Sequence, residues 1–219
     1  MQSLDHFIDS LAESTPTPGG GGAAGVAGAL AASLNHMVAG LTANRRKYAQ
    51  HQDELNSILE RSKTLRADLI QAIEDDAHVY KRVVTVLSYR TDKNDQSVTQ
   101  AIEDALIGAA QVPLGVIQLC NEIAEIGERL IKIGLEHAAA DAAGAIFLAQ
   151  AAAKISLLNI KANMREVTDN KLKTSWINKG TRLVNKINEV AEQAEAKLGE
   201  SMSKPRSAGE GRRRRRRAK

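Results

Sequence analysis

A stretch of small and apolar residues without any Asp, Glu, Lys or Arg runs from Gly19 to Ala43. It is long enough to cross a membrane as a helix. Glycine and alanine, however, gain little free energy on transfer into lipid, and Asn35 and His36 near the middle would be costly there. The stretch therefore predicts a helix buried among other helices, with backbones that approach one another closely.

Apolar residues recur at helical spacing along nearly the whole chain, and no alternating strand pattern lies between turn signals. Although 43% of the residues are hydrophobic, only two Phe, three Tyr and one Trp are among them. The core is therefore expected to consist of Ala, Leu, Ile and Val, which suit close contacts between helices. We expect an all-α fold, an antiparallel multi-helix bundle over residues 1–200. A second stretch without charged residues lies between Asp141 and Lys154. The two charge-poor helices leave more apolar surface than one bundle needs, which predicts a dimer.

The limits of the expected helices follow from turn signals and from breaks in the apolar period. Pro16 and Pro18 end a short first helix. Pro113 fits the first turn of a helix and predicts a new start there. Gly199 is expected to end the last helix. The approximate helical ranges are 4–11, 23–41, 53–89, 98–106, 113–133, 136–164 and 176–199.

The end of the chain differs in composition from the rest. Residues 204–219 carry nine Lys or Arg against one Glu, and a disordered tail is expected over residues 201–219. The net charge of +4 therefore hides a mildly acidic body of 21 basic and 25 acidic residues. Six adjacent arginines, Arg212 to Arg217, predict weak contact of the tail with nucleic acid or another polyanion.

Cysteine usage and the start of the chain bear on its compartment. Cys120 is the single cysteine, so no internal disulfide can form. No charged segment followed by an apolar leader comes after Met1. A cytoplasmic protein without a membrane anchor is expected.

Four glycines, Gly19-Gly20-Gly21-Gly22, open the charge-free stretch. Gly20-x-Gly22-x-x-Gly25 matches a dinucleotide fingerprint in form, but no strand precedes it and no acidic residue follows at the required distance. A P-loop is excluded as well, because no Gly-Lys-Ser/Thr ends the run. Two interpretations remain open: a tight turn between helices, or a helix N-terminus whose free N–H groups meet an anion.

Two further groups of residues are candidates for ligand contacts. Arg45-Arg46-Lys47-Tyr48 follows the charge-free helix. It forms either a solvated helix end or a site for the carboxylates of an anionic ligand. Asp141 stands alone in a later helix, near whose end Asn159 and Asn163 share one face. These three residues either bridge helices or line a polar pocket.

Asp76 is the candidate for proton transfer. It lies in Glu74-Asp75-Asp76, at the margin of a long apolar stripe. Partial desolvation there would raise the pKa of its carboxyl group, as a general acid or base requires. A solvated acidic face is the other interpretation. No second set of His, Cys or acidic residues has metal-ligand spacing, so no metal is expected.

Taken in order, these elements resemble the cyclodeaminase/cyclohydrolase family of folate enzymes over about residues 3–200. The resemblance implies a helical bundle that dimerises and holds folate in a cleft. It implies that Asp76 donates and accepts the proton and that the other candidate residues bind folate, with no cofactor beyond the tetrahydrofolate substrate. The motifs that carry it are Pro18-Gly19-Gly20-Gly21, Met37-Val38-x-x-Leu41-Thr42, Arg45-Arg46-Lys47-Tyr48, Asp76-Ala77-x-x-Tyr80, Val112-Pro113-Leu114, Asp141, and Leu158-Asn159 with Asn163.

Two activities occur in that family. One is cyclisation of 5-formiminotetrahydrofolate with loss of ammonia; the other is hydrolysis of 5,10-methenyltetrahydrofolate to the 10-formyl form. Both pass through a tetrahedral adduct at the one-carbon centre, where a carboxylate can move a proton.

The chain departs from the commonest family pattern at two positions. Gly22 stands where Ser often follows the three glycines, and Ala140 stands where Ser often precedes the Asp. A glycine at position 22 is similar to the pattern of free-standing cyclohydrolases, and we expect no fused formiminotransferase domain. We therefore expect methenyltetrahydrofolate cyclohydrolase activity, with the cyclodeaminase and a non-catalytic helical partner protein as alternatives.

Overall fold

The computed structural model describes residues 3–89 and 96–203. Within these ranges all regular structure is helical, which confirms the all-α prediction. The helices are α1 (Leu4–Ala12), α2 (Gly20–Ala43), α3 (Gln52–Ser88), α4 (Gln96–Ile133), α5 (Ala139–Asn163) and α6 (Asn170–Ser203), with short 3₁₀ helices η1 (Arg46–His51), η2 (Glu136–Ala138) and η3 (Met164–Glu166).

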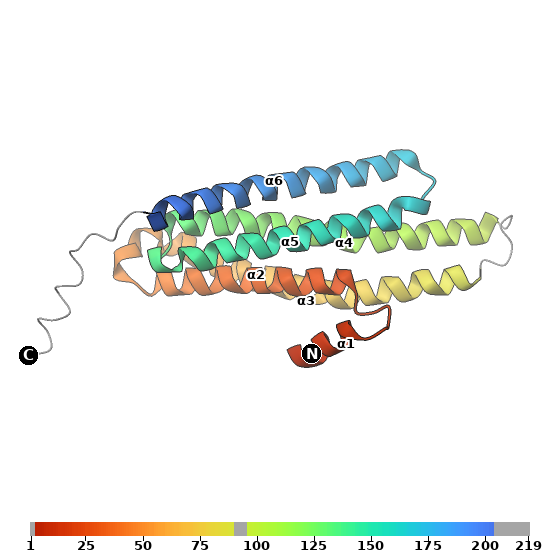
Figure 1. Cartoon of the computed structure of the whole chain (residues 1–219), viewed down its shortest axis with the longest axis horizontal. Coiled ribbons are helices and arrows are strands. Elements are labelled where there is room, and N and C mark those ends of the chain that lie inside the picture. The colour runs from red at the N-terminus through yellow and green to blue at the C-terminus, as the bar shows by residue number, and fades with distance from the viewer. Residues whose placement is uncertain (1–2, 90–95, 204–219) are drawn as a thin grey trace, which may run out of the picture.

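The five long helices lie side by side as an elongated antiparallel bundle, and the short α1 projects from its side (Figure 1). Helix α2 packs mainly against α3 and α5, and α4 packs against α3, α5 and α6. Successive long helices run in opposite directions, so the start of α2 lies beside the last turns of α5, while α3 and α4 extend beyond this point (Figure 1). The C-terminus of α2 and the start of α5 lie at the other end of the bundle (Figure 1).

The core consists of alanine and branched aliphatic side chains, as the composition predicts. Helices α2 and α5 contribute mainly alanines, whereas α3 and α4 supply larger residues. Alanine lets neighbouring helices approach closely, and α2 and α3 come closer still. A Cβ atom built on Gly25 would lie 2.6 Å from Ile73 Cγ1. Only a residue without a side chain fits this contact.

Several predicted helix limits are wrong. Helix α2 starts within the glycine run, because the Ala23 N–H already donates to the Gly19 carbonyl at 3.0 Å. Helix α4 passes through Pro113 instead of starting there. Helix α6 starts at Asn170, six residues before its predicted start, and continues past Gly199 to Ser203, across the predicted boundary at residue 200. Residues 204–219 of the predicted tail, and residues 90–95 between the helices predicted over 53–89 and 98–106, lie outside the described residues.

A hydrogen bond from a distant helix explains how α4 tolerates its proline. Pro113 has no N–H, so the carbonyl of Ala109 lacks its helical partner. Asn163 Nδ2, on α5, donates to that carbonyl at 3.0 Å. The loss of one hydrogen bond within the helix is thus offset by a bond between helices, and α4 stays continuous.

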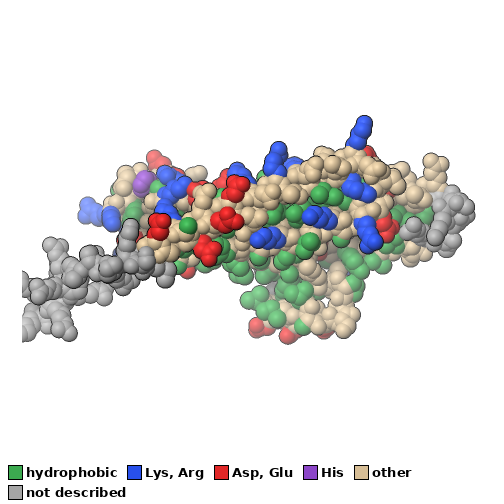
Figure 2. Space-filling view, turned by 45° about the horizontal axis from the view of Figure 1, so that its top comes forward, with side chains coloured by type: hydrophobic (Ala, Val, Ile, Leu, Met, Phe, Trp, Pro, Cys, Tyr) green, Lys and Arg blue, Asp and Glu red, His purple; other side chains and the backbone are tan. Residues whose placement is uncertain are grey.

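Three helical stretches are long and apolar enough to cross a membrane, namely Gly20–Ala43, Gln96–Ile133 and Glu136–Glu166. In the bundle, 44%, 50% and 50% of their apolar windows are buried, so packing uses about half of that surface. Charged side chains cover the face over α6, whereas hydrophobic side chains lie below them and on the projecting α1 (Figure 2). The exposed large hydrophobic residues of α2 and α5 are Leu30, Met37, Leu41, Phe147 and Leu158.

Candidate functional site

Asp76 meets the N-terminus of α2. The backbone N–H of Gly22 donates a hydrogen bond to the Asp76 carboxylate. That carboxylate lies directly over Gly21: a Cβ atom built there would be 2.0 Å from Asp76 Oδ1 and 2.4 Å from Oδ2. Of the two interpretations of the glycine run, the structure adopts the helix N-terminus that faces an anion. The anion is a side chain of the protein itself.

The environment of Asp76 favours its protonated form. Partial burial raises the pKa of the Asp76 carboxyl group because the charged form loses hydration, and the Gly22 hydrogen bond opposes this shift only in part. Its neighbour Glu74 is exposed, and Asp75 accepts a hydrogen bond from Gln71 at 3.0 Å. Asp76 is therefore the acidic residue of this cluster that can exchange a proton nearer neutral pH.

Asn159 approaches the same helix N-terminus from α5. A Cβ atom on Gly20 would lie 3.8 Å from Asn159 Oδ1 and 3.9 Å from Nδ2. The side chain is half-buried, and the described residues form no side-chain hydrogen bond with it. The first turn of α2 thus has Asp76 on one side and an amide on the other, both available to a ligand.

Asn163 lies one turn further along α5, but its amide is engaged. Nδ2 donates to Ala109, so Asn163 bridges two helices, the first of the two roles the sequence left open. A contact between this residue and folate stays a prediction, and it would have to use Oδ1.

The remaining predicted site residues lie at the opposite end of the bundle. Helix α2 has 24 residues, so its two ends are about 35 Å apart. Arg45, Arg46, Lys47 and Tyr48 follow its C-terminus, as predicted, and Lys47 Nζ lies 5.6 Å from the centre of the Tyr48 ring. Within the described part of the chain the three cations are exposed and form no ion pair.

Asp141 also belongs to that far end, because it lies in the first turn of α5. Asp141 and Asn159 are five helical turns apart, a spacing that puts both on one face but separates them by about 27 Å. One chain therefore does not bring Asp141 into a common pocket with Asn159 and Asn163.

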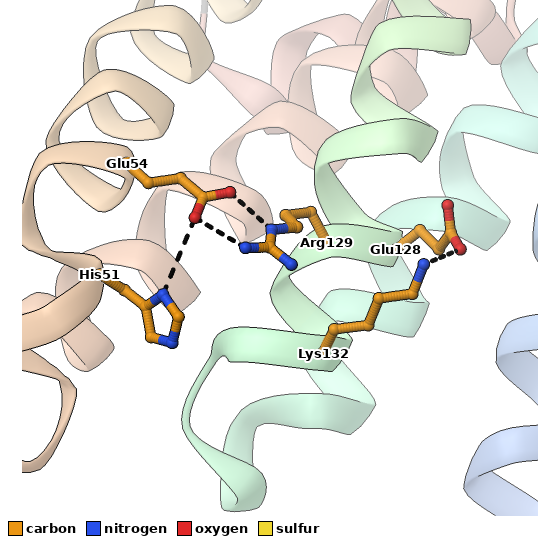
Figure 3. A network of polar contacts seen from close by, with 5 residues as sticks. All are labelled: His51, Glu54, Glu128, Arg129 and Lys132. Carbon is orange, nitrogen blue, oxygen red and sulfur yellow. Dashed lines mark hydrogen bonds and ion pairs between the residues drawn. The ribbon is translucent and has the colours of Figure 1, made fainter.

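Ion pairs fix the far end of the bundle (Figure 3). Arg129 of α4 binds Glu54 of α3 through Nε–Oε1 at 2.6 Å and Nη2–Oε2 at 2.9 Å, and His51 Nδ1 lies 3.9 Å from Oε2. The hydrogen bonds from Arg129 lower the pKa of Glu54. On α4 itself, Lys132 pairs with Glu128. These contacts join α3 to α4 beside η1 and leave Arg45, Arg46 and Lys47 outside the network.

Phe7 is a neighbour of the glycine run that sequence reasoning missed. A Cβ atom on Gly22 would lie 3.6 Å from the Phe7 ring and 3.4 Å from Pro18 Cβ. The two prolines turn the chain so that α1 places this ring beside the start of α2. Among the described residues, no group of three or more His, Cys, Asp or Glu side chains is placed to hold a metal ion.

Comparisons with known proteins show which family the chain is similar to. The family model described as Formiminotransferase-cyclodeaminase matches residues 3–181. Methenyltetrahydrofolate cyclohydrolase of Methylorubrum extorquens is 34% identical over 170 residues, which cover 77% of this chain and 82% of that protein. Formimidoyltransferase-cyclodeaminase of Gallus gallus is 21% identical over 183 residues, which cover 83% of this chain but only 34% of that protein.

The crystal structure of formiminotetrahydrofolate cyclodeaminase from Thermotoga maritima superposes with a TM-score of 0.84 at 26% sequence identity. The superposition covers 92% of this chain and 98% of the other. The family model spans most of the chain, and a relative above 30% identity is covered over most of its length. The chain therefore belongs to the formiminotransferase-cyclodeaminase family.

Proposed function

We propose that the protein hydrolyses 5,10-methenyltetrahydrofolate to 10-formyltetrahydrofolate. The observation that carries this proposal is the half-buried Asp76 carboxylate at the N-terminus of α2, held by the Gly22 N–H. The Methylorubrum extorquens relative, named a methenyltetrahydrofolate cyclohydrolase, supports hydrolysis over deamination. Gly22, in a position where Ser is common in the family, supports the same choice.

Asp76 would serve as both base and acid in this reaction. Water adds to the one-carbon bridge between the two ring nitrogens, and the ionised carboxylate accepts a proton from it. The C–N bond to one nitrogen then breaks as the protonated carboxyl group returns its proton to that nitrogen, and the hydroxyl group of the adduct releases its proton to solvent as the formyl C=O forms. A carboxyl group with a raised pKa suits both steps near neutral pH. The free amide of Asn159, across the first turn of α2, would orient the pterin ring.

The proposal includes a homodimer. Helices α2 and α5 pack against each other and both carry exposed apolar side chains, and α2 carries no Asp, Glu, Lys or Arg that would repel a second copy. In an antiparallel arrangement, the Arg45–Lys47 end of one α2 would lie near the Gly20–Gly22 end of the other. Residues that one chain keeps about 35 Å apart would then share one folate, with the cations on its carboxylates.

An absorbance assay of methenyltetrahydrofolate consumption tests the proposed reaction. The wild type should consume the substrate faster than the uncatalysed rate, and Asp76→Asn should lose this acceleration. Equal rates for the two proteins would remove Asp76 from the mechanism.

The second candidate is the formiminotetrahydrofolate cyclodeaminase, the name carried by the structural neighbour from Thermotoga maritima. Release of ammonia from 5-formiminotetrahydrofolate by the purified protein would support it. A protein that binds no reduced folate would instead be a non-catalytic helical partner.

Three further proposals concern the compartment, the cofactor and the basic tail. We propose a cytoplasmic enzyme with no cofactor beyond its folate substrate and with weak polyanion binding by Arg212 to Arg217. Nucleic-acid retention by the full chain should exceed that of a chain ending at Ser201. Equal retention would make the tail irrelevant to binding.

A further inference from the structure

Three glycines of α2 face three residues of α3 along one line of contact. Gly21, Gly25 and Gly28 follow one another at helical spacing and meet Asp76, Ile73 and Leu69 respectively. A Cβ atom on Gly28 would lie 2.9 Å from Leu69 Cδ2, and one on Gly25 would also lie 3.1 Å from the Leu69 carbonyl oxygen. The two helices therefore run too close together for side chains on this line. That spacing brings Asp76 onto the backbone of α2.

Gly21 differs from the glycines beside it in what its missing side chain makes room for. The Asp76 carboxylate fills that space, with Oδ1, Cγ and Oδ2 all within 2.4 Å of the Cβ position. At Gly20 the nearest atom would be Ile155 Cγ2 at 3.6 Å, and at Gly22 it would be Pro18 Cβ at 3.4 Å. These are ordinary contacts. Sterically, Gly21 is the member of Gly20–Gly22 that cannot carry a side chain.

We propose that Gly21 is a positioning residue for the reaction: its missing side chain forms the seat of the Asp76 carboxylate, beside the Gly22 N–H that holds it. The catalytic part of this inference rests on the proposed function. The seat fixes the rotamer of Asp76 and occupies one face of the carboxylate, so its free oxygen is presented in one direction. A methyl group at Gly21 would push the carboxylate off the backbone.

The catalytic test is Gly21→Ala in the cyclohydrolase assay. Displacement of a catalytic group by about 1 Å can reduce a rate about a hundredfold, so kcat should fall strongly while KM changes little. The acid limb of the pH profile should also move to lower pH. Burial is the main reason that the pKa of Asp76 is raised, and the displaced carboxyl group would be more hydrated.

Gly115→Ala is the matched control for activity. Gly115 lies in α4, and a Cβ atom there would meet nothing within 4 Å. This variant should keep the wild-type kcat and pH profile. A Gly21→Ala enzyme with the same kcat and the same acid limb as Gly115→Ala would overturn the proposal.

A stability cycle tests the seat without using activity. Gly21→Ala should lower the urea midpoint of unfolding in the wild type and in Asp76→Asn, because the asparagine side chain fills the same space. In the Asp76→Ala background the same change should cost nothing, since the clash is gone. Gly20→Ala, in the same turn, should leave the midpoint near the wild-type value in all three backgrounds.

The two experiments separate the inference from the proposed function. The protein could lack cyclohydrolase activity while Gly21→Ala still destabilises the wild type but not Asp76→Ala. That result would overturn the proposed function and support the role of Gly21 in seating the carboxylate. Conversely, the protein could be active while Gly21→Ala lowers the urea midpoint equally in the wild-type and Asp76→Ala backgrounds. That result would support the proposed function and overturn the role of Gly21 in seating the carboxylate.

Discussion

Asn163 Nδ2 donates a hydrogen bond to the carbonyl of Ala109, 54 residues earlier in the chain. That carbonyl is the one that Pro113 deprives of its helical N–H. A side chain of α5 therefore replaces the hydrogen-bond donor that α4 lacks, which explains how a proline fits in the middle of a long helix.

Asn163→Ala should lower the free energy of unfolding by about 1–3 kcal/mol, because it leaves a buried carbonyl without a partner. Urea unfolding measures the loss. In a Pro113→Ala background residue 113 regains its N–H, so the same change at Asn163 should cost less. Equal losses of unfolding free energy in both backgrounds would mean that Asn163 does not compensate for the proline.

Asp76→Asn should reduce kcat by about 10²- to 10⁴-fold, the range for loss of a positioned acid or base. The amide keeps the size of the carboxyl group, so the variant should remain folded. Rates from the absorbance assay and a circular dichroism spectrum together check both points. A folded variant with the wild-type kcat would exclude the proposed role.

The same residue predicts a pH dependence of stability. The pKa of Asp76 is higher in the folded protein than in the unfolded chain, so its stabilising contribution is complete below the unfolded pKa, about 4. This contribution is lost as the pH rises through the folded pKa. The unfolding free energy of the wild type should therefore fall relative to that of Asp76→Asn as the pH is raised from about 4. Urea titrations at a series of pH values measure the difference, and parallel curves would contradict it.

Gly25→Ala should destabilise the protein by about 1–3 kcal/mol, the usual cost of overpacking a core. The added methyl group would meet Ile73 and the Leu69 carbonyl, and that carbonyl belongs to a rigid helix. Gly108→Ala is the control, since a Cβ atom there meets nothing within 4 Å. Thermal unfolding should separate the two variants, and equal midpoints would mean that α2 can move away from α3 without cost.

Light scattering coupled to gel filtration should report a dimer for the wild type and a monomer for Leu30→Glu with Leu158→Glu. Both side chains are exposed in the single chain, at 48% and 66%, so the charges should not unfold it. A mixture of Asp76→Asn and Lys47→Ala proteins should regain activity if one site uses both copies. Persistence of the dimer in the double variant would place the interface elsewhere.

The helical spacing of apolar residues predicted most of the fold, because long amphipathic helices place apolar residues at regular intervals in the sequence. It failed where a distant residue compensates for a local signal. Pro113 indicates a helix start unless Asn163 is known to lie beside it. The glycine run allows a turn as well as a helix N-terminus, because the Asp76 carboxylate that occupies its surface lies far away in the chain.

The candidate site shows a second limit of what helical spacing can predict. The spacing tells on which face of a helix a residue lies, but not which residues of other helices lie at the same level along the bundle. Asp76 was identified correctly as lying at the margin of an apolar stripe, since Leu69 and Ile73 precede it at helical spacing. Asp141 and Asn159 share a face by the same rule, yet the length of α5 separates them. Only the packing of antiparallel helices decides which ends meet.

Helix α1 buries none of its residues, and the Phe7 ring beside Gly22 is its point of contact with the start of α2. A segment attached so lightly opens at a much smaller free energy than the bundle needs for unfolding. Amide exchange in α1 should therefore be fast while that of α2 and α3 is slow. Helix α1, on the outer side of the Asp76 site, can then fluctuate while the closely packed pair of α2 and α3 stays rigid. Motion that admits substrate therefore need not disturb the position of the Asp76 carboxylate.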